Sequence, residues 1–230
     1  MTSEAGRRRA AIGRRSRETE IALSLDLGGG EVSVDSGIGF LDHLVGSLAL
    51  HAGWGLELYC RGDLEVDEHH SAEDCALALG EALARALASG PRPRRFASAY
   101  APLDEALARA VVDLSGRPFC RAVLGLGTAR LGALAGENAE HFVSSLAMAA
   151  RATIHLEVLT GENAHHRAEA AFKALALALR EACAPAGLSA TGAAEAAASA
   201  KGAVLLEELS PELFAERSAA LRARPAGGRR

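Results

Sequence analysis

Apolar side chains occupy every second position from Ile21 to Leu27, and the positions between them are mostly polar or small. This alternation predicts a strand with one buried face. The glycines at 28–30 then predict a turn, and Val32 and Val34 predict a returning strand. We therefore expect the two strands to pair as a hairpin.

A change from alternation to helical spacing follows. Leu41, Leu44 and Leu48 recur at helical intervals and predict a helix that carries His43. Further elements are a strand at 56–66 and a helix at 71–87. The first half of the chain is thus expected to run strand, strand, helix, strand, helix.

The second half repeats this order. Strands are predicted at 107–114, 119–126 and 153–159, a turn at 115–118, and helices at 137–151 and 165–183. Neither half could bury its sheet alone. We therefore predict an α+β fold in which two repeated half-domains pack as one pseudo-symmetric unit, with the sheets covered by helices.

Pro, Gly and Arg residues at 90–95 predict the link between the halves. The predicted parts are a disordered basic N-terminal tail at 1–14, a first half at 15–92, a second half at 93–205 and a C-terminal extension at 206–230.

Composition and charge exclude some classes of protein. Of the 230 residues 49% are hydrophobic and 23% charged, which suits a packed globular core. The formal net charge of -4 argues against a general nucleic-acid binder, and no apolar run approaches the roughly 20 residues of a membrane helix. The four cysteines show no CxxC spacing, so we expect reduced thiols in a cytoplasmic protein.

Two adjacent histidines followed three residues later by a glutamate occur twice. The copies are His69-His70-Ser71-Ala72-Glu73 and His165-His166-Arg167-Ala168-Glu169. Each has a solitary histidine upstream, since His43 lies 26 positions before His69 and His141 lies 24 before His165. Six of the eight histidines therefore belong to one duplicated pattern.

On a helix, the first histidine of each pair and the glutamate share a face. Imidazole nitrogen and carboxylate oxygen together suit divalent Mn, Fe or Zn. The second histidine points about 100° away around the helix, so it reaches a different metal. We predict two metal ions, each with three imidazoles and one carboxylate. The first set is His43, His70, His165 and Glu169, and the second is His69, Glu73, His141 and His166.

Two other functions would also use such residues. A dinuclear metallohydrolase acting on a phosphoester is one, although such sites usually carry more bridging carboxylates. A metal-storage shell protein is the other, but ferritin-like sites place the glutamate before the histidine on bundle helices without interleaved strands.

The chain resembles the imidazoleglycerol-phosphate dehydratase family from about Arg15 to Leu205. The matching strings are Arg17-Glu18-Thr19, Gly37–His43, Gly62-Asp63-Leu64, Asp67–Asp74, Asp104-Glu105-Ala106, Asp113–Pro118, Asn163–His166 and Phe172-Lys173-Ala174. The resemblance implies a lyase of histidine biosynthesis that converts imidazoleglycerol phosphate to imidazole-acetol phosphate.

The resemblance also implies two Mn2+ ions per active site, with ligands at the eight residues above. Substrate contacts are implied at Glu18, Arg95, Arg117 and Lys173, and at Ser199 and Lys201 in the string Ser199-Ala200-Lys201-Gly202, where Ala replaces the family's Thr. His51 is a further candidate to fix substrate. The implied assembly is a homo-oligomer of 24 subunits built from trimers, with active sites at subunit interfaces.

The implied reaction removes water across C2 and C3. Two metals bound to the ring nitrogens would hold the imidazole as imidazolate, which expels the C3 hydroxyl to give a diazafulvene-like intermediate. The C2 proton then becomes removable. Glu18 is our candidate for the proton transfers, with a metal-bound water as the alternative.

Overall fold

The computed structural model describes residues 8–186, and all of them fall in one compact unit. The first half contains one strand more than predicted, and the second half contains three more, β5 and the two-residue strands β8 and β9. The first half runs β1 (Arg9–Arg15), β2 (Thr19–Asp26), β3 (Val32–Asp35), α1 (Gly39–Ala52), β4 (Gly55–Gly62) and α2 (His69–Ala88). The second half runs β5 (Phe96–Leu103), β6 (Ala106–Asp113), β7 (Phe119–Val123), β8 (Arg130–Leu131), β9 (Leu134–Ala135), α3 (Gly136–Ala149), β10 (Thr153–Thr160) and α4 (Ala164–Cys183).

The two four-stranded sheets have equivalent topologies. Their strand orders are β1-β2-β4-β3 and β5-β6-β10-β7, and in each the third and fourth strands of that order run parallel. A parallel pair needs a crossover connection, which α1 supplies between β3 and β4 and α3 supplies between β7 and β10. The predicted α+β fold with two repeated halves is therefore confirmed.

The predicted hairpin across the glycines at 28–30 is wrong. The strand β2 pairs with β1 and β4, whereas β3 pairs only with β4, through contacts such as Val32 opposite Leu56. In the second half β7 likewise pairs with β10 and not with β6, the strand that precedes the turn at 115–118. Alternation shows which face of a strand is buried, but it does not show which strand is its neighbour.

The predicted disordered tail is also wrong over its second part, because residues 9–15 form β1. This strand pairs with β2 in antiparallel register from Arg9 opposite Asp26 to Arg15 opposite Glu20. Ile12 turns into the core, and Arg14 forms an ion pair of 2.8 Å with the buried Asp74 of α2. Arg9 and Arg14 are therefore strand residues whose side chains form ion pairs with Asp26 and Asp74.

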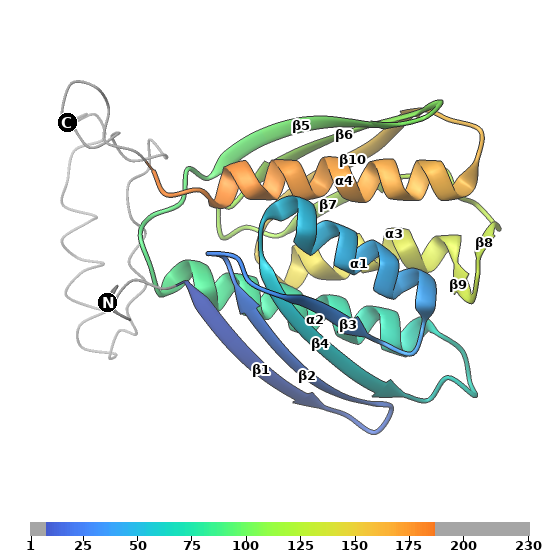
Figure 1. Ribbon diagram of the computed structural model, residues 1–230, viewed down its shortest axis with the longest axis horizontal. Coiled ribbons are helices and arrows are strands. Elements are labelled where there is room, and N and C mark those ends of the chain that lie inside the picture. The colour runs from blue at the N-terminus through green and yellow to red at the C-terminus, as the bar shows by residue number, and fades with distance from the viewer. Residues whose placement is uncertain (1–7, 187–230) are drawn as a thin grey trace, which may run out of the picture. The chain divides into compact units, whose positions relative to one another are not determined.

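The four helices form a layer between the two sheets (Figure 1). Helix α2 packs on β1 and β2, and α4 packs on β5 and β6. Between the sheets, α1 contacts α4 and α2 contacts α3. The halves therefore meet through their helices. Among the described helices, none is long and apolar enough to cross a bilayer.

Small residues let these helices approach closely. A Cβ at Gly80 of α2 would lie 2.7 Å from both the Cβ of Ala149 and the carbonyl oxygen of Leu146 on α3. The rings of Phe142 on α3 and Phe172 on α4 lie 5.8 Å apart and are fully buried. The close approach at Gly80 sets the distance between α2 and α3, which both carry predicted metal ligands.

Candidate metal centre

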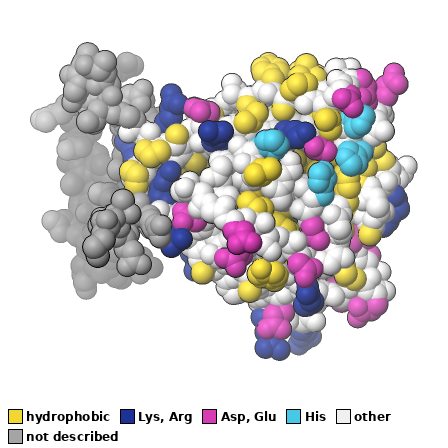
Figure 2. Space-filling view, in the orientation of Figure 1, with side chains coloured by type: hydrophobic (Ala, Val, Ile, Leu, Met, Phe, Trp, Pro, Cys, Tyr) yellow, Lys and Arg dark blue, Asp and Glu magenta, His cyan; other side chains and the backbone are white. Residues whose placement is uncertain are grey.

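The first cluster of predicted ligands lies between α1 and α4. The Nε2 atoms of His43 and His165 each lie 3.1 Å from the same atom, Oε2 of Glu169. Ligands about 2.1 Å from one ion, at right angles to one another, lie about 3 Å apart. The three side chains therefore fit a divalent cation. Figure 2 shows histidines clustered beside acidic side chains on the face where α1 and α4 lie in Figure 1.

The second cluster lies between α2 and α3. The Nε2 atoms of His69 and His141 each lie 3.6 Å from a carboxylate oxygen of Glu73. The two imidazole rings stack with their centroids 4.8 Å apart. In both clusters the three possible ligand atoms lie within 4.8 Å of one another. The spacing of this trio is looser than that of the first, but its donor atoms are of the same kinds.

Each cluster combines residues of both halves. His43 is in the first half while His165 and Glu169 are in the second, and the other cluster is divided in the opposite sense. The sequence hypothesis grouped these same three residues in each of its two ligand sets. His70 and His166, which it named as the fourth ligands, lie outside the clusters of their own chain.

His70 and His166 are instead held by acidic residues. Nδ1 of His70 lies 3.0 Å and 3.2 Å from the two carboxylate oxygens of Asp63, and Nδ1 of His166 lies 2.7 Å from Oε2 of Glu105. On the other side of each ring, Nε2 of His70 lies 3.8 Å from Glu18, and Nε2 of His166 lies 3.7 Å from Asp104. His70 and His166, the second histidines of the two pairs, therefore have equivalent surroundings.

The start of a helix fixes each histidine pair. The side chain of Asn163 caps α4 by accepting hydrogen bonds from the backbone N–H groups of His165 and His166. Such a cap contributes about 1 kcal/mol. At the start of α2 the carboxylate of Asp67 accepts the N–H of His69, at 2.8 Å. Both pairs are thus placed on ordered backbone.

Glu169 is strongly acidic. Its burial would raise its pKa, but hydrogen bonds from Lys173, His43 and His165 outweigh burial and lower the pKa to about 2. The pKa of Glu105 is also about 2, chiefly because the backbone N–H of Asn163 donates to it. Both carboxylates are therefore ionised at neutral pH.

The second histidines bind protons more tightly than a free imidazole. The hydrogen bond to Asp63 is the largest cause that raises the pKa of His70, and the hydrogen bond to Glu105 does the same for His166. Metal binding needs a deprotonated imidazole nitrogen. A metal ion that binds either histidine must therefore compete with a proton over a wider range of pH.

The remaining predicted residues divide into three groups. Glu18 reaches His70, and Lys173 lies with Nζ 2.7 Å from Oε1 of Glu169, so both stand beside predicted ligands. Arg95 and Arg117 meet at another residue, Asp113, at 2.6 Å and 4.0 Å.

The third group consists of His51, Ser199 and Lys201. His51 lies two turns beyond His43 near the end of α1, half-buried. Ser199 and Lys201 lie outside the described residues. Asp63 and Glu105 have no role predicted from the sequence, although both stand in the strings that resemble the family. Asn138, whose Oδ1 lies 3.0 Å from Nδ1 of His69, was not predicted, because nothing in its local sequence indicates a role.

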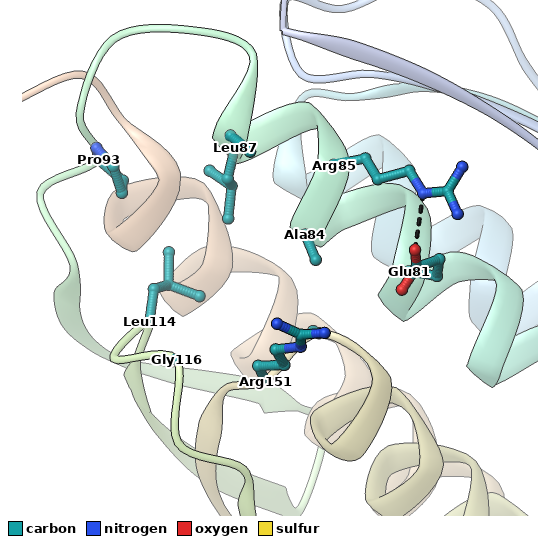
Figure 3. Close-up of a pocket in the computed structure, with 10 residues that line it drawn as sticks. Glu81, Ala84, Arg85, Leu87, Pro93, Leu114, Gly116 and Arg151 are labelled. Carbon is teal, nitrogen blue, oxygen red and sulfur yellow. Dashed lines mark hydrogen bonds and ion pairs between the residues drawn. The ribbon is translucent and has the colours of Figure 1, made fainter. Parts of the chain in front are cut away.

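A cavity of about 350 Å³ lies apart from the histidine clusters, although its lining residues Leu114 and Gly116 adjoin Arg95 and Arg117 (Figure 3). Its lining includes Ala84, Leu87, Leu114 and the paired Glu81 and Arg85, but none of the predicted site residues. Glu81 is twelve residues beyond His69 on α2, so the cavity begins about 18 Å along the helix from the histidine cluster. The candidate metal centre is therefore the pair of histidine clusters and not this cavity.

Two imidazole and carboxylate clusters on a duplicated α+β fold define a metal-dependent enzyme. Comparison with known proteins makes this class specific. Residues 36–179 match the family model described as imidazoleglycerol-phosphate dehydratase. The chain belongs to this family, and it is a hydro-lyase of histidine biosynthesis.

Similar proteins of that name come from several fungi. The chain is 49% identical to the one from Candida glabrata, with 77% of this chain and 94% of the relative covered. It is 46% identical to the one from Trichoderma harzianum, with 78% and 99% covered.

Solved structures of the same family agree with this fold. The crystal structure of the dehydratase from Pyrococcus furiosus in complex with (S)-C348 is 35% identical, with a TM-score of 0.72, and covers 84% of this chain and 100% of its own. The Staphylococcus aureus structure is 31% identical, with a TM-score of 0.69, and covers 76% of this chain and 98% of its own.

Proposed function

We propose that this enzyme converts imidazoleglycerol phosphate to imidazole-acetol phosphate at two Mn2+ ions held by the eight predicted ligands. The observation that carries the proposal is the mirrored pair of trios, His43, His165 and Glu169 on one side and His69, Glu73 and His141 on the other. Each trio supplies two imidazoles and one carboxylate, which suits Mn2+. The family membership supports the substrate.

The fourth ligand of each set comes from a neighbouring copy of the chain. His70 and His166 belong to no trio of their own chain, and their Nε2 atoms face Glu18 and Asp104 at the ends of two hairpins. A second copy that faces these hairpins would complete the sets. This requirement supports the homo-oligomer that the family resemblance implies, a shell of 24 subunits built from trimers with active sites between subunits.

The two cations, when bound to the substrate's ring, would stabilise its anionic form and so favour loss of the C3 hydroxyl. The chain's residues then have to move a proton from C2. Glu18 is placed for this task, because its side chain is half-exposed and its carboxylate lies beside His70, one of the proposed ligands. Elimination of water followed by tautomerisation of the enol gives the ketone.

The substrate's phosphate needs cationic partners. Arg95, Arg117, Lys173 and Lys201, with Ser199, are our candidates, and His51 is a further candidate for substrate contact. Arg95 and Arg117 share Asp113, which gathers two guanidinium groups at one end of β6. Lys173 balances Glu169 in the absence of substrate.

We place the enzyme in the cytoplasm. All four cysteines are free thiols, and three of them are buried. This agrees with a reducing compartment.

The experiment is a metal-dependent assay with the full chain. Protein stripped with a chelator should form no ketone from imidazoleglycerol phosphate, and added Mn2+ should restore its formation. Full activity after complete metal removal would contradict the proposal. Release of phosphate from generic esters would point instead to the hydrolase.

A further inference from the structure

The acidic residues that touch the second histidines form two mirrored contacts. Glu105 lies in the turn between β5 and β6, and Asp63 directly follows β4. Each carboxylate meets Nδ1 of one histidine, His166 at 2.7 Å and His70 at 3.0 Å. Neither carboxylate belongs to a trio or to the proposed phosphate site.

An ionised carboxylate can only accept a hydrogen bond, so Nδ1 must carry the hydrogen. A neutral imidazole with a hydrogen on Nδ1 has its lone pair on Nε2. Nε2 is also the atom that faces the carboxylate in all four histidines of the trios. The contacts to Glu105 and Asp63 therefore leave free the same nitrogen that the other four histidines present.

We propose that Glu105 and Asp63 are positioning residues that hold His166 and His70 in the tautomer whose Nε2 binds the metal. This inference rests on the proposed function, in which both histidines are ligands. Carboxylates behind metal-binding histidines commonly fix the ring and its tautomer, and their loss lowers metal affinity about 10- to 100-fold.

The two carboxylates differ in their freedom to turn. Oε1 of Glu105 accepts the backbone N–H groups of Glu162 and Asn163, at 3.2 Å and 2.9 Å, so only Oε2 remains for His166. Both oxygens of Asp63 lie near Nδ1 of His70, and no other hydrogen bond to its side chain is present among residues 8–186.

This difference separates the effects of two isosteric substitutions. In Glu105→Gln the amide oxygen keeps the two backbone hydrogen bonds, because turning it would set the NH2 group against two donors. The NH2 group then faces Nδ1 of His166, which favours the tautomer with the hydrogen on Nε2. In Asp63→Asn the amide can turn its oxygen toward His70 and preserve the tautomer.

The test is calorimetric titration of Mn2+ into the metal-stripped full chain. Glu105→Gln and Asp63→Ala should each weaken binding by about 10- to 100-fold. Asp63→Asn should stay near the wild-type affinity, as should Glu162→Gln, which removes the charge of an exposed residue whose backbone N–H donates to Glu105.

A melting curve of the metal-free protein separates positioning from folding. Because the backbone contacts of residue 105 survive, Glu105→Gln should shift the melting temperature by less than about 2 °C. Wild-type affinity in Glu105→Gln would overturn the inference while leaving the proposed metal sites intact. Equal losses in Asp63→Asn and Asp63→Ala would also overturn it, even if Glu105→Gln did not fold. A wild-type chain that binds no Mn2+ would refute the proposed function itself.

Discussion

His43 and Glu169 are 126 positions apart in the chain, yet their Nε2 and Oε2 atoms lie 3.1 Å apart. The contact joins α1 of the first half to α4 of the second. It follows from the packing of the crossover helix of the first half against the last helix of the second half. The metal centre is thus a product of how the halves meet.

Removing His43 should abolish one of the two metal sites. We expect His43→Ala to bind about one Mn2+ per chain in a calorimetric titration, where the wild type binds two, because the α2 and α3 cluster shares no residue with it. His155→Ala is the control, since this histidine is exposed on β10 and packs on Phe119. Two tight sites in His43→Ala would disprove the ligand assignment.

Replacing Glu18 should separate catalysis from metal binding. Glu18→Gln removes the proposed proton-transfer group but keeps the shape of the side chain. Turnover should fall by about 100-fold or more while Mn2+ content is unchanged. Glu20→Gln, two residues along on the exposed face of β2, should keep full activity. Near-normal turnover in Glu18→Gln would show that another group transfers the proton.

Acid should destabilise the metal-free protein through Glu169. A carboxyl whose pKa falls from 4.5 to about 2 on folding stabilises the fold above pH 4.5, and this contribution is lost as the pH falls toward 2. The loss amounts to as much as about 3 kcal/mol. Urea unfolding across this range should show the trend, and Glu169→Gln should flatten it. An unchanged slope in Glu169→Gln would mean that other carboxylates carry the dependence.

Packing between α2 and α3 should tolerate no side chain at position 80. Gly80→Leu improves helix propensity by about 1 kcal/mol, but it drives atoms into Ala149 and the backbone at Leu146. Overpacking of this kind costs typically 1–3 kcal/mol, about 2–4 °C of melting temperature for each kcal/mol.

Gly46→Ala in α1 is the matched control, because a Cβ there meets no atom within 4 Å. It should leave the melting temperature unchanged or raise it. An increase in Gly80→Leu would show that the two helices can move apart.

The sequence predicts those features of the fold that depend on local spacing. Alternation from Ile21 to Leu27 marks β2, and the helices predicted at 71–87, 137–151 and 165–183 lie within two residues of the bounds of α2, α3 and α4. The neighbours of a strand depend instead on contacts far along the chain. For that reason the sequence did not predict β1, whose arginines resemble those of a disordered tail. It also did not predict that β4 lies beside β2.

The same division applies to the site. His69 and Glu73 share a helical face, so their partnership follows from spacing alone. The contact of His166 with Glu105 does not, because it arises where a hairpin turn meets the start of α4. Roles that depend on turns brought together by the sheets become visible only in the folded chain.

Because the helices of one half pack against those of the other, the continuity of the backbone between the halves matters for metal binding. α1 meets α4, and α2 meets α3, so every trio draws on both sides of the connection at 89–95. A chain severed in that connection would yield two fragments that each carry donors for both ions and complete neither trio. Metal binding would then require the two fragments to associate, so metal affinity would depend on the concentration of the fragments.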